Sequence, residues 1–281
     1  MLTQFTEETF EQVLHHFKES PAIDLREITF IDPYGMVGLL EMGELFKKEG
    51  IQKRIYLPES EEILKYLERM DFFQFSDRYF ILEPSKPDIS EKYLRSSYSD
   101  VLLEITPIEK SDDIHFIVGK VKERSHAILA RHLHYDENAI NGFIVALSEA
   151  CQNIIEHSEY KGFVGIQKYH FNNLNKNVVK IAVMDIGRGF RKSLSERFAF
   201  KNDLEAIERG LLHGASRFAD KGRGHGLSAV RRFVKQWDGK ISIRSGTAKL
   251  SIIPDWARGK AKETNLTYLP GAQINIMLPE I

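Results

Sequence analysis

The stretch Leu147-Ser-Glu-Ala-Cys-Gln-Asn-Ile-Ile-Glu-His157 belongs to a predicted helix that runs from Glu137 to His157. Glu149 and Asn153 stand four residues apart in it, so a helix places both side chains on one face. A carboxylate and an amide oxygen on one face can orient a water molecule and ligate a hard cation. A solvated polar face is the alternative, because polar pairs at this spacing are common in helices.

A second motif, Asp185-Ile-Gly-Arg-Gly189, closes an apolar strand predicted at Val178–Met184. A carboxylate at the end of a strand can accept a hydrogen bond from an exocyclic amine, such as that of adenine. Gly187 and Gly189 let the backbone approach a flat ring and adopt positive φ. An ordinary turn that ends the strand is the alternative interpretation.

The third motif, Gly222-Arg-Gly-His-Gly-Leu227, opens a helix predicted at Leu227–Trp237. Its glycines carry no Cβ, and the exposed N–H groups at the start of a helix attract phosphate oxygens. Lys221 and Arg223 add positive charge to this segment. A flexible loop is the alternative. A dinucleotide-binding fingerprint is disfavoured because no strand precedes the glycines, and a Walker loop because no Gly-Lys-Ser/Thr follows them.

The three motifs follow one another within one domain-sized block. Together they contain a carboxylate, a metal-binding amide, a base-reading carboxylate and a phosphate cradle. These are the parts needed to hold Mg-ATP, so the combination favours a nucleotide site over three unrelated turns.

The bulk composition describes an ordinary globular chain of 281 residues, long enough for about two domains. Its 39 basic and 40 acidic residues give a net charge of -1, which argues against a general nucleic-acid or membrane-surface binder. The single cysteine, Cys151, excludes an intrachain disulfide. With no signal-like start and no apolar run of about 20 residues, we expect a cytoplasmic protein.

Two blocks of regular pattern are separated by a polar joint at Glu83–Ser90, where two prolines disfavour a helix or a central strand. We expect a first domain over 1–88, a linker over 89–99 and a second domain over 100–281. The first block predicts, in order, a helix at Thr6–Phe17, a strand between Ile23 and Phe30, a helix from Pro33 to Gly50, a strand at Arg54–Leu57 and a helix at Glu59–Met70. This succession is typical of strands covered by helices.

The second block alternates long helices with strands. Its predicted elements are a strand at Val101–Thr106, helices at Ile114–Leu133 and Glu137–His157, strands at Phe163–Tyr169 and Val178–Met184, a polar, partly helical segment at Arg191–Asp220, a helix at Leu227–Trp237, and late strands at Lys240–Arg244 and Ala272–Leu278.

From about residue 100 onward the chain resembles the histidine-kinase, gyrase, Hsp90 and MutL (GHKL) type of ATP-binding domain. The three motifs look like its N, G1 and G2 boxes. The resemblance implies ATP and Mg²⁺ as cofactors. It implies that Asn153 ligates Mg²⁺, that Glu149 is the catalytic general base and that Asp185 reads the adenine amine. The implied nucleotide-contacting residues are Asn153, Asp185, Gly187, Gly189, Lys221, Gly222, Arg223, Gly224, His225, Gly226 and Leu227.

The stretch around Glu149 is most similar to the anti-sigma-factor serine-kinase branch, where His157 also matches. We nevertheless interpret His157 as a histidine at a helix end. The resemblance implies an ATP lid from about Phe190 to Lys221, which at about 30 residues is long for that branch. A histidine kinase is disfavoured, since no coiled-coil pattern surrounds the histidines before the ATP domain.

The segment Ala22-Ile-Asp-Leu-Arg-Glu-Ile-Thr-Phe-Ile-Asp-Pro-Tyr-Gly resembles the anti-sigma-factor-antagonist (STAS) pattern, in which a strand runs into Asp-Ser-Ser-Gly and a helix. Tyr34 stands where that family carries its phosphorylated serine, and the initial strands of the usual fold are missing. We therefore expect a minimal docking or regulatory domain that its own kinase domain does not phosphorylate. An unrelated small α/β domain is the alternative.

The expected fold class is α/β (α+β): a small STAS-like α/β domain followed by a GHKL-type two-layer α/β sandwich with a mixed sheet. The expected function is that of an anti-sigma-type serine/threonine kinase or partner-switching regulator. The alternatives are an ATPase whose lid closure gates a protein interface, and a non-catalytic nucleotide-sensing adaptor. A regulatory protein, of STAS or sigma-factor type, is the expected partner, with neither nucleic acid nor membrane; a homodimer is left open.

Overall fold

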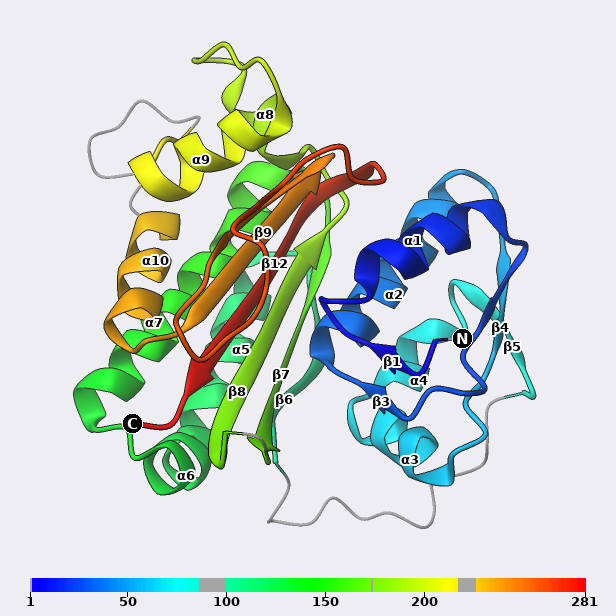
Figure 1. The fold of residues 1–281 in the computed structure, drawn as a ribbon, viewed down its shortest axis with the longest axis horizontal. Coiled ribbons are helices and arrows are strands. Elements are labelled where there is room, and N and C mark those ends of the chain that lie inside the picture. Colours follow the sequence, from blue (N-terminus) through cyan, green and yellow to red (C-terminus); the bar gives the residue numbers. More distant parts are fainter. Residues whose placement is uncertain (1, 86–99, 173, 217–225) are drawn as a thin grey trace.

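The computed structural model describes residues 2–85, 100–172, 174–216 and 226–281. Figure 1 shows the first of these ranges, the N-terminal unit, packed against one face of a large sheet. The remaining ranges form the C-terminal unit, which contains that sheet and the helices on its other face. No helix among the described residues is long and apolar enough to span a bilayer. The linker expected at 89–99 lies outside the described residues.

The N-terminal unit is a small α/β layer. In chain order it contains β1 (Gln4–Phe5), α1 (Phe10–Glu19), β2 (Ala22–Asp24), β3 (Phe30–Ile31), α2 (Pro33–Lys48), β4 (Lys53–Tyr56), α3 (Glu61–Arg69), α4 (Phe72–Ser76) and β5 (Phe80–Glu83). Strands β2, β4 and β5 form a parallel sheet, and β1 pairs with β3 in parallel. The predicted helices are present, whereas the strand predicted between Ile23 and Phe30 is divided into β2 and β3.

Helix α2 begins as its sequence predicts. Pro33 occupies the first turn, where a missing N–H costs nothing, and the Asp32 carboxylate accepts a hydrogen bond of 2.9 Å from the N–H of Gly35. Tyr34 follows and is only 2% exposed, with its ring edge-on to Phe10 of α1. Tyr34, which aligns with the phosphorylated serine of the STAS pattern, is therefore buried inside the molecule.

The C-terminal unit contains four longer helices and most of the strands. Its elements are β6 (Val101–Ile108), α5 (Ser111–Ser125), the π-helical turn η1 (His126–Ala130), α6 (Arg131–Leu133), α7 (Glu137–Asn153), the π-helical turn η2 (Ile154–Ser158), β7 (Gly162–Phe171), β8 (Lys176–Asp185), α8 (Gly189–Leu194), α9 (Asp203–His213), α10 (Gly226–Gln236), β9 (Lys240–Gly246), β10 (Ala248–Ile252), β11 (Lys262–Glu263) and β12 (Leu269–Pro279). The helix predicted at Ile114–Leu133 is interrupted by η1 and continues as α6, whereas the helix predicted at Glu137–His157 ends in η2. Strands β10 and β11 had no predicted counterpart.

Seven strands form the large sheet in the order β11-β10-β9-β12-β8-β7-β6. Every pair in it is antiparallel, so the prediction of a mixed sheet is wrong for this unit. The reason is connectivity. Short turns join β7 to β8 and β9 to β10 as antiparallel hairpins. The helices that follow β8 lead to β9, and β12 lies between β8 and β9 in the sheet and is antiparallel to both.

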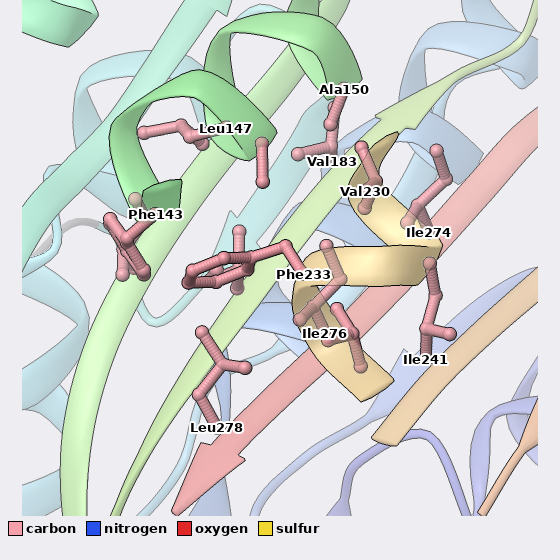
Figure 2. Close-up of a cluster of buried hydrophobic side chains, with 14 of the residues drawn as sticks. Phe143, Leu147, Ala150, Val183, Val230, Phe233, Ile241, Ile274, Ile276 and Leu278 are labelled. Carbon is pink, nitrogen blue, oxygen red and sulfur yellow. The ribbon is translucent and has the colours of Figure 1, made fainter. Parts of the chain in front are cut away.

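The hydrophobic core of the C-terminal unit lies between this sheet and helices α5, α7 and α10. Figure 2 shows Phe143 and Leu147 of α7 beside Phe233 of α10, over Ile276 and Leu278 of β12. Strand residues alternate between the two faces, so every second side chain of β8, β9 and β12 enters this core. The core fixes α7, and with it the motif that contains Glu149 and Asn153.

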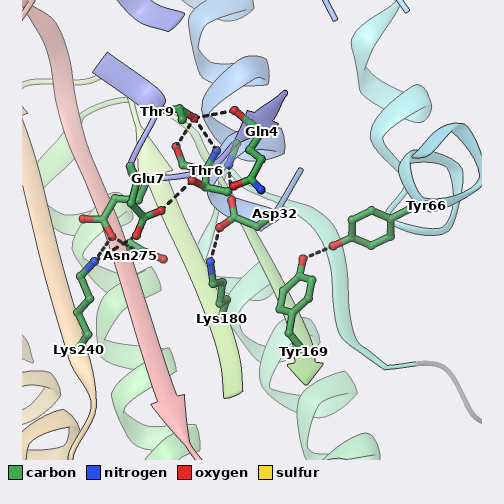
Figure 3. A network of polar contacts seen from close by, with 12 residues as sticks. Gln4, Thr6, Glu7, Thr9, Asp32, Tyr66, Tyr169, Lys180, Lys240 and Asn275 are labelled. Atoms are coloured by element: carbon green, nitrogen blue, oxygen red, sulfur yellow. Dashed lines mark hydrogen bonds and ion pairs between the residues drawn. The ribbon is translucent and has the colours of Figure 1, made fainter. Parts of the chain in front are cut away.

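The opposite face of the sheet carries polar as well as apolar side chains and is buried by the N-terminal unit. Lys180 of β8 pairs with Asp32 at 2.8 Å, and Lys240 of β9 pairs with Glu7 at 2.9 Å. Figure 3 shows these contacts with Asn275 of β12, whose amide donates to Glu7. All five side chains are less than 9% exposed. The two units therefore share one buried interface held by ion pairs in addition to apolar contacts.

Candidate functional site

A cavity of about 360 Å³ lies where α7, the end of β8 and the start of α10 meet. This volume is within the usual range for a small-molecule site. The residues predicted from the three motifs that line it are Glu149, Asn153, Asp185, Gly189, Gly226 and Leu227. The fold thus brings the three motifs together around one cavity.

Glu149 and Asn153 come from the last turns of α7 and lie on its cavity side. The Asn153 side-chain N–H donates to the main-chain oxygen of Glu149 at 2.6 Å. That bond occupies a donor of the amide, so its oxygen is the atom suited to ligate a cation.

The start of α10 closes against this face of α7. A Cβ at Gly226 would lie 2.7 Å from Oε2 of Glu149, so only glycine fits here without displacing the carboxylate. Leu227 is buried and anchors the first turn of α10 in the core. The other predicted residues of this motif, Lys221, Gly222, Arg223, Gly224 and His225, lie outside the described residues.

Asp185 ends β8 and is 4% exposed. Its Oδ1 accepts hydrogen bonds from the Ser158 hydroxyl at 2.7 Å and from the N–H of Gly187 at 2.8 Å. Burial raises the pKa of this carboxyl to about 6, and these two hydrogen bonds lower it only in part. Asp185 is therefore a desolvated acceptor that an additional N–H donor inside the cavity would stabilise.

Gly187 and Gly189, which follow Asp185, are each required for a different steric reason. A Cβ at Gly187 would lie 2.0 Å from the Ser158 hydroxyl, so glycine permits the contact with η2. Gly189 has φ +69°, and a Cβ there would lie 2.7 Å from the Ser245 hydroxyl. Gly187 is not at the cavity surface, and it acts through its bond to Asp185.

A second buried carboxyl, Glu41 of α2, lies behind this strand end and is 1% exposed. Burial, together with the negative charges of Asp185 and Glu44, raises its pKa well above its ordinary value. Among the described residues its Oε1 has no hydrogen-bond partner. The N-terminal unit therefore places a carboxyl within electrostatic reach of Asp185.

Several cavity residues had no predicted role. Ser158, in η2, orients Asp185, and nothing in its local sequence marks it. His157 lines the cavity as well as standing at a helix end, so our interpretation of it was incomplete. The expected lid is described up to residue 216. It contains part of α8 and all of α9, and Phe190 and Leu194 of α8 line the cavity.

The described residues contain no cluster of three or more histidine, cysteine, aspartate or glutamate side chains that could hold a metal ion. Mg²⁺ bound with a nucleotide does not need such a cluster, since it takes one or two protein oxygens together with phosphate oxygens and water. The Asn153 amide oxygen, the desolvated Asp185 acceptor and the space left by Gly226 fit Mg-ATP.

Part of the chain is similar to a known protein family. Residues 139–272 match the family model described as histidine kinase-, DNA gyrase B- and HSP90-like ATPase. Domains of this family bind ATP with Mg²⁺. Over 97% of its length the chain is similar to 93% of a solved histidine kinase domain, from the Erythrobacter litoralis EL346 blue-light activated histidine kinase, at 10% identity and a TM-score of 0.27. No curated protein matches the chain.

Proposed function

We propose that the chain is an ATP-dependent regulatory protein that binds Mg-ATP in this cavity and acts on a protein partner. The observation that carries the proposal is the meeting of Glu149, Asn153, Asp185 and Gly226 around one cavity inside a domain of an ATPase family. Asn153 would ligate Mg²⁺, Asp185 would accept from the adenine amine, and the glycine-rich segment that ends at Gly226 would enclose the phosphates.

Bound Mg-ATP would supply a transferable γ-phosphoryl group. Glu149 would accept the proton from the attacking hydroxyl, which belongs either to a serine or threonine of a partner or to water. The lid helices α8 and α9 would exclude bulk water, since α8 lines the cavity beside Asp185. The leading proposal is transfer to a partner, as in the anti-sigma serine kinases that the α7 stretch resembles.

The N-terminal unit fits a docking or regulatory role. We propose that residues 1–88 form a STAS-like domain, that 89–99 form a linker and that 100–281 form the ATP-binding domain. Burial of Tyr34 supports the expectation that this residue is not a phosphoacceptor. Incubation of the full chain with ATP labelled at the γ-position, followed by peptide mapping, tests this; stoichiometric label on Tyr34 would overturn it.

Transfer to a partner and an ATPase-driven switch predict different fates for the γ-phosphate. Proteins captured from a lysate with and without ATP should become labelled if the chain is a kinase, whereas release of inorganic phosphate without protein label supports the ATPase switch. Glu149→Gln should abolish turnover in either case while ATP binding persists, because the glutamine amide cannot accept the proton. Full turnover by this variant would refute the role of Glu149.

A further inference from the structure

Arg244 of β9 joins the N-terminal unit to the nucleotide end of the sheet. Its side chain is fully buried on the face opposite the core helices. Its Nε donates to Oε1 of Glu11 at 2.5 Å, and its Nη2 donates to Oε2 of the same carboxylate at 3.2 Å. This two-point contact ties helix α1 to the middle of the sheet with a fixed geometry.

The same guanidinium continues the contact toward the cavity. Arg244 Nη1 donates to the side-chain oxygen of Gln273 at 3.4 Å, and the Gln273 amide nitrogen donates to the main-chain oxygen of Asp185 at 3.0 Å. Gln273 is fully buried, so its orientation is set by these partners and by a further bond to Pro270. A continuous series of hydrogen bonds thus leads from Glu11 to Asp185.

Strand β12 is irregular where this series reaches it. Its pairing with β9 shifts register between Leu269 and Gln273, and Gly271 has φ +78°. A Cβ at Gly271 would lie 2.0 Å from the main-chain oxygen of Asp185, so the bulge is in close contact with the end of β8. The N–H of Ala272 also donates to the Asp185 carboxyl and lowers its pKa. The bulge therefore forms one wall of the Asp185 environment.

We infer that Glu11 is a positioning residue for the base-reading carboxylate, so that docking of the N-terminal unit sets how well the cavity discriminates adenine. This inference rests on the proposed role of Asp185. Arg244 and Gln273 transmit the effect by holding the β12 bulge against Asp185. Thermodynamic linkage requires the reciprocal effect, in which bound ATP strengthens the contact between α1 and the sheet.

Glu7 provides a matched control, because it is also a carboxylate of the N-terminal unit that pairs with a β9 side chain. Its partners include Lys240, at 2.9 Å, Asn275, at 2.6 Å, and Lys249 of β10, at 3.9 Å. Figure 3 shows this cluster, in which the Glu7 carboxylate accepts hydrogen bonds from Lys240 and Asn275 rather than from the side chains that lead to Asp185. Loss of Glu7 weakens docking without interrupting the series that begins at Glu11.

The test compares the affinities of the full chain for ATP and for inosine triphosphate, which lacks the exocyclic amine. The unchanged chain should prefer ATP by roughly tenfold or more, because an unmatched buried acceptor is costly. Glu11→Gln should reduce this preference at least threefold and leave the affinity for inosine triphosphate unchanged. Gln273→Met should have the same effect, because it removes the hydrogen bonds to Arg244 and to the main-chain oxygen of Asp185.

Glu7→Gln should lower the melting temperature while keeping the preference for ATP. The inference is overturned if Glu11→Gln and Gln273→Met keep the full preference, or if Glu7→Gln reduces it equally. The variant Asp185→Asn distinguishes failure of the inference about Glu11 from failure of the proposed function. An unchanged preference in that variant, or no ATP binding by the unchanged chain, refutes the role of Asp185 itself and the inference with it.

Discussion

The Ser158 hydroxyl donates a hydrogen bond of 2.7 Å to the Asp185 carboxylate, and so links the end of helix α7 to the end of strand β8. Ser158 belongs to the π-helical turn that directly follows Asn153. One short segment therefore carries the proposed metal-ligating amide and orients the proposed base-reading acid. This contact brings the first two motifs together although they are more than 25 residues apart in sequence.

ATP affinity should fall as the pH falls through about 6, the raised pKa of Asp185. Protonation of the carboxylate removes the acceptor that the adenine amine needs, so affinity should drop about tenfold for each pH unit below that value. Calorimetric titration between pH 7.5 and 5 measures the effect. The nucleotide phosphates also titrate, and Asp185→Asn controls for them. Identical pH profiles for the unchanged chain and the variant would contradict the prediction.

Glu41→Gln should flatten the dependence of stability on pH. The pKa of Glu41 is raised well above the ordinary value of 4.5, so the folded state keeps a proton that the unfolded state releases. Stability therefore falls as the pH rises above about 4.5, by up to about 1.4 kcal/mol per pH unit for this one group. Urea unfolding at several pH values should show a smaller slope and greater stability for the variant at pH 8. Equal slopes would show that Glu41 is already ionised in the folded chain.

Gly189→Ala should destabilise the chain and weaken ATP binding together. Its φ of +69° costs a side-chain-bearing residue about 1–2 kcal/mol, and the added Cβ would meet the Ser245 hydroxyl at 2.7 Å. Gly119→Ala is the matched control, because nothing lies within 4 Å of a Cβ at that position in α5. We expect the control to be stabilised by about 0.4–1 kcal/mol. Thermal unfolding and ATP titration of both variants check this, and equal effects would argue against the strained turn.

Lys180→Met should strongly destabilise the interface between the two units. It leaves the fully buried Asp32 carboxylate without its partner, at an expected cost of about 3–5 kcal/mol in the free energy of unfolding. The same change at Lys262, which is 58% exposed and pairs with the partly exposed Glu208, should cost less than about 1 kcal/mol. Combining Lys180→Met with Asp32→Asn should restore part of the loss. A cost below 1 kcal/mol for Lys180→Met would mean that this pair does not hold the units together.

Most helices and strands could be predicted from the sequence, because each depends on local spacing. The meeting of the three motifs was predicted instead from their combination and from the family resemblance that they carry. Glu149 and Asn153 share a face through helical periodicity, and Asp185 ends an apolar run. Two features depend on long-range pairing that local pattern does not encode. These are the all-antiparallel sheet and the bulge of β12 against Asp185.

The burial of the sheet face opposite the core helices could not be predicted from the sequence either. In β9 the polar residues Lys240, Ser242 and Arg244 alternate with apolar ones, a pattern typical of a strand with one solvated face. Here both cations are buried, because Glu7 and Glu11 of the N-terminal unit compensate their charges. Complementary charges more than 200 residues apart carry no local signal of their pairing.

Calorimetric titration of the full chain with ATP, with and without Mg²⁺, tests the central claim most directly. The account predicts saturable binding of one nucleotide per chain that depends on Mg²⁺, and an affinity about 10- to 100-fold lower for Asp185→Asn, the loss expected for one charge-assisted hydrogen bond. Absence of binding by the unchanged chain, or equal affinity in the folded variant, would contradict it.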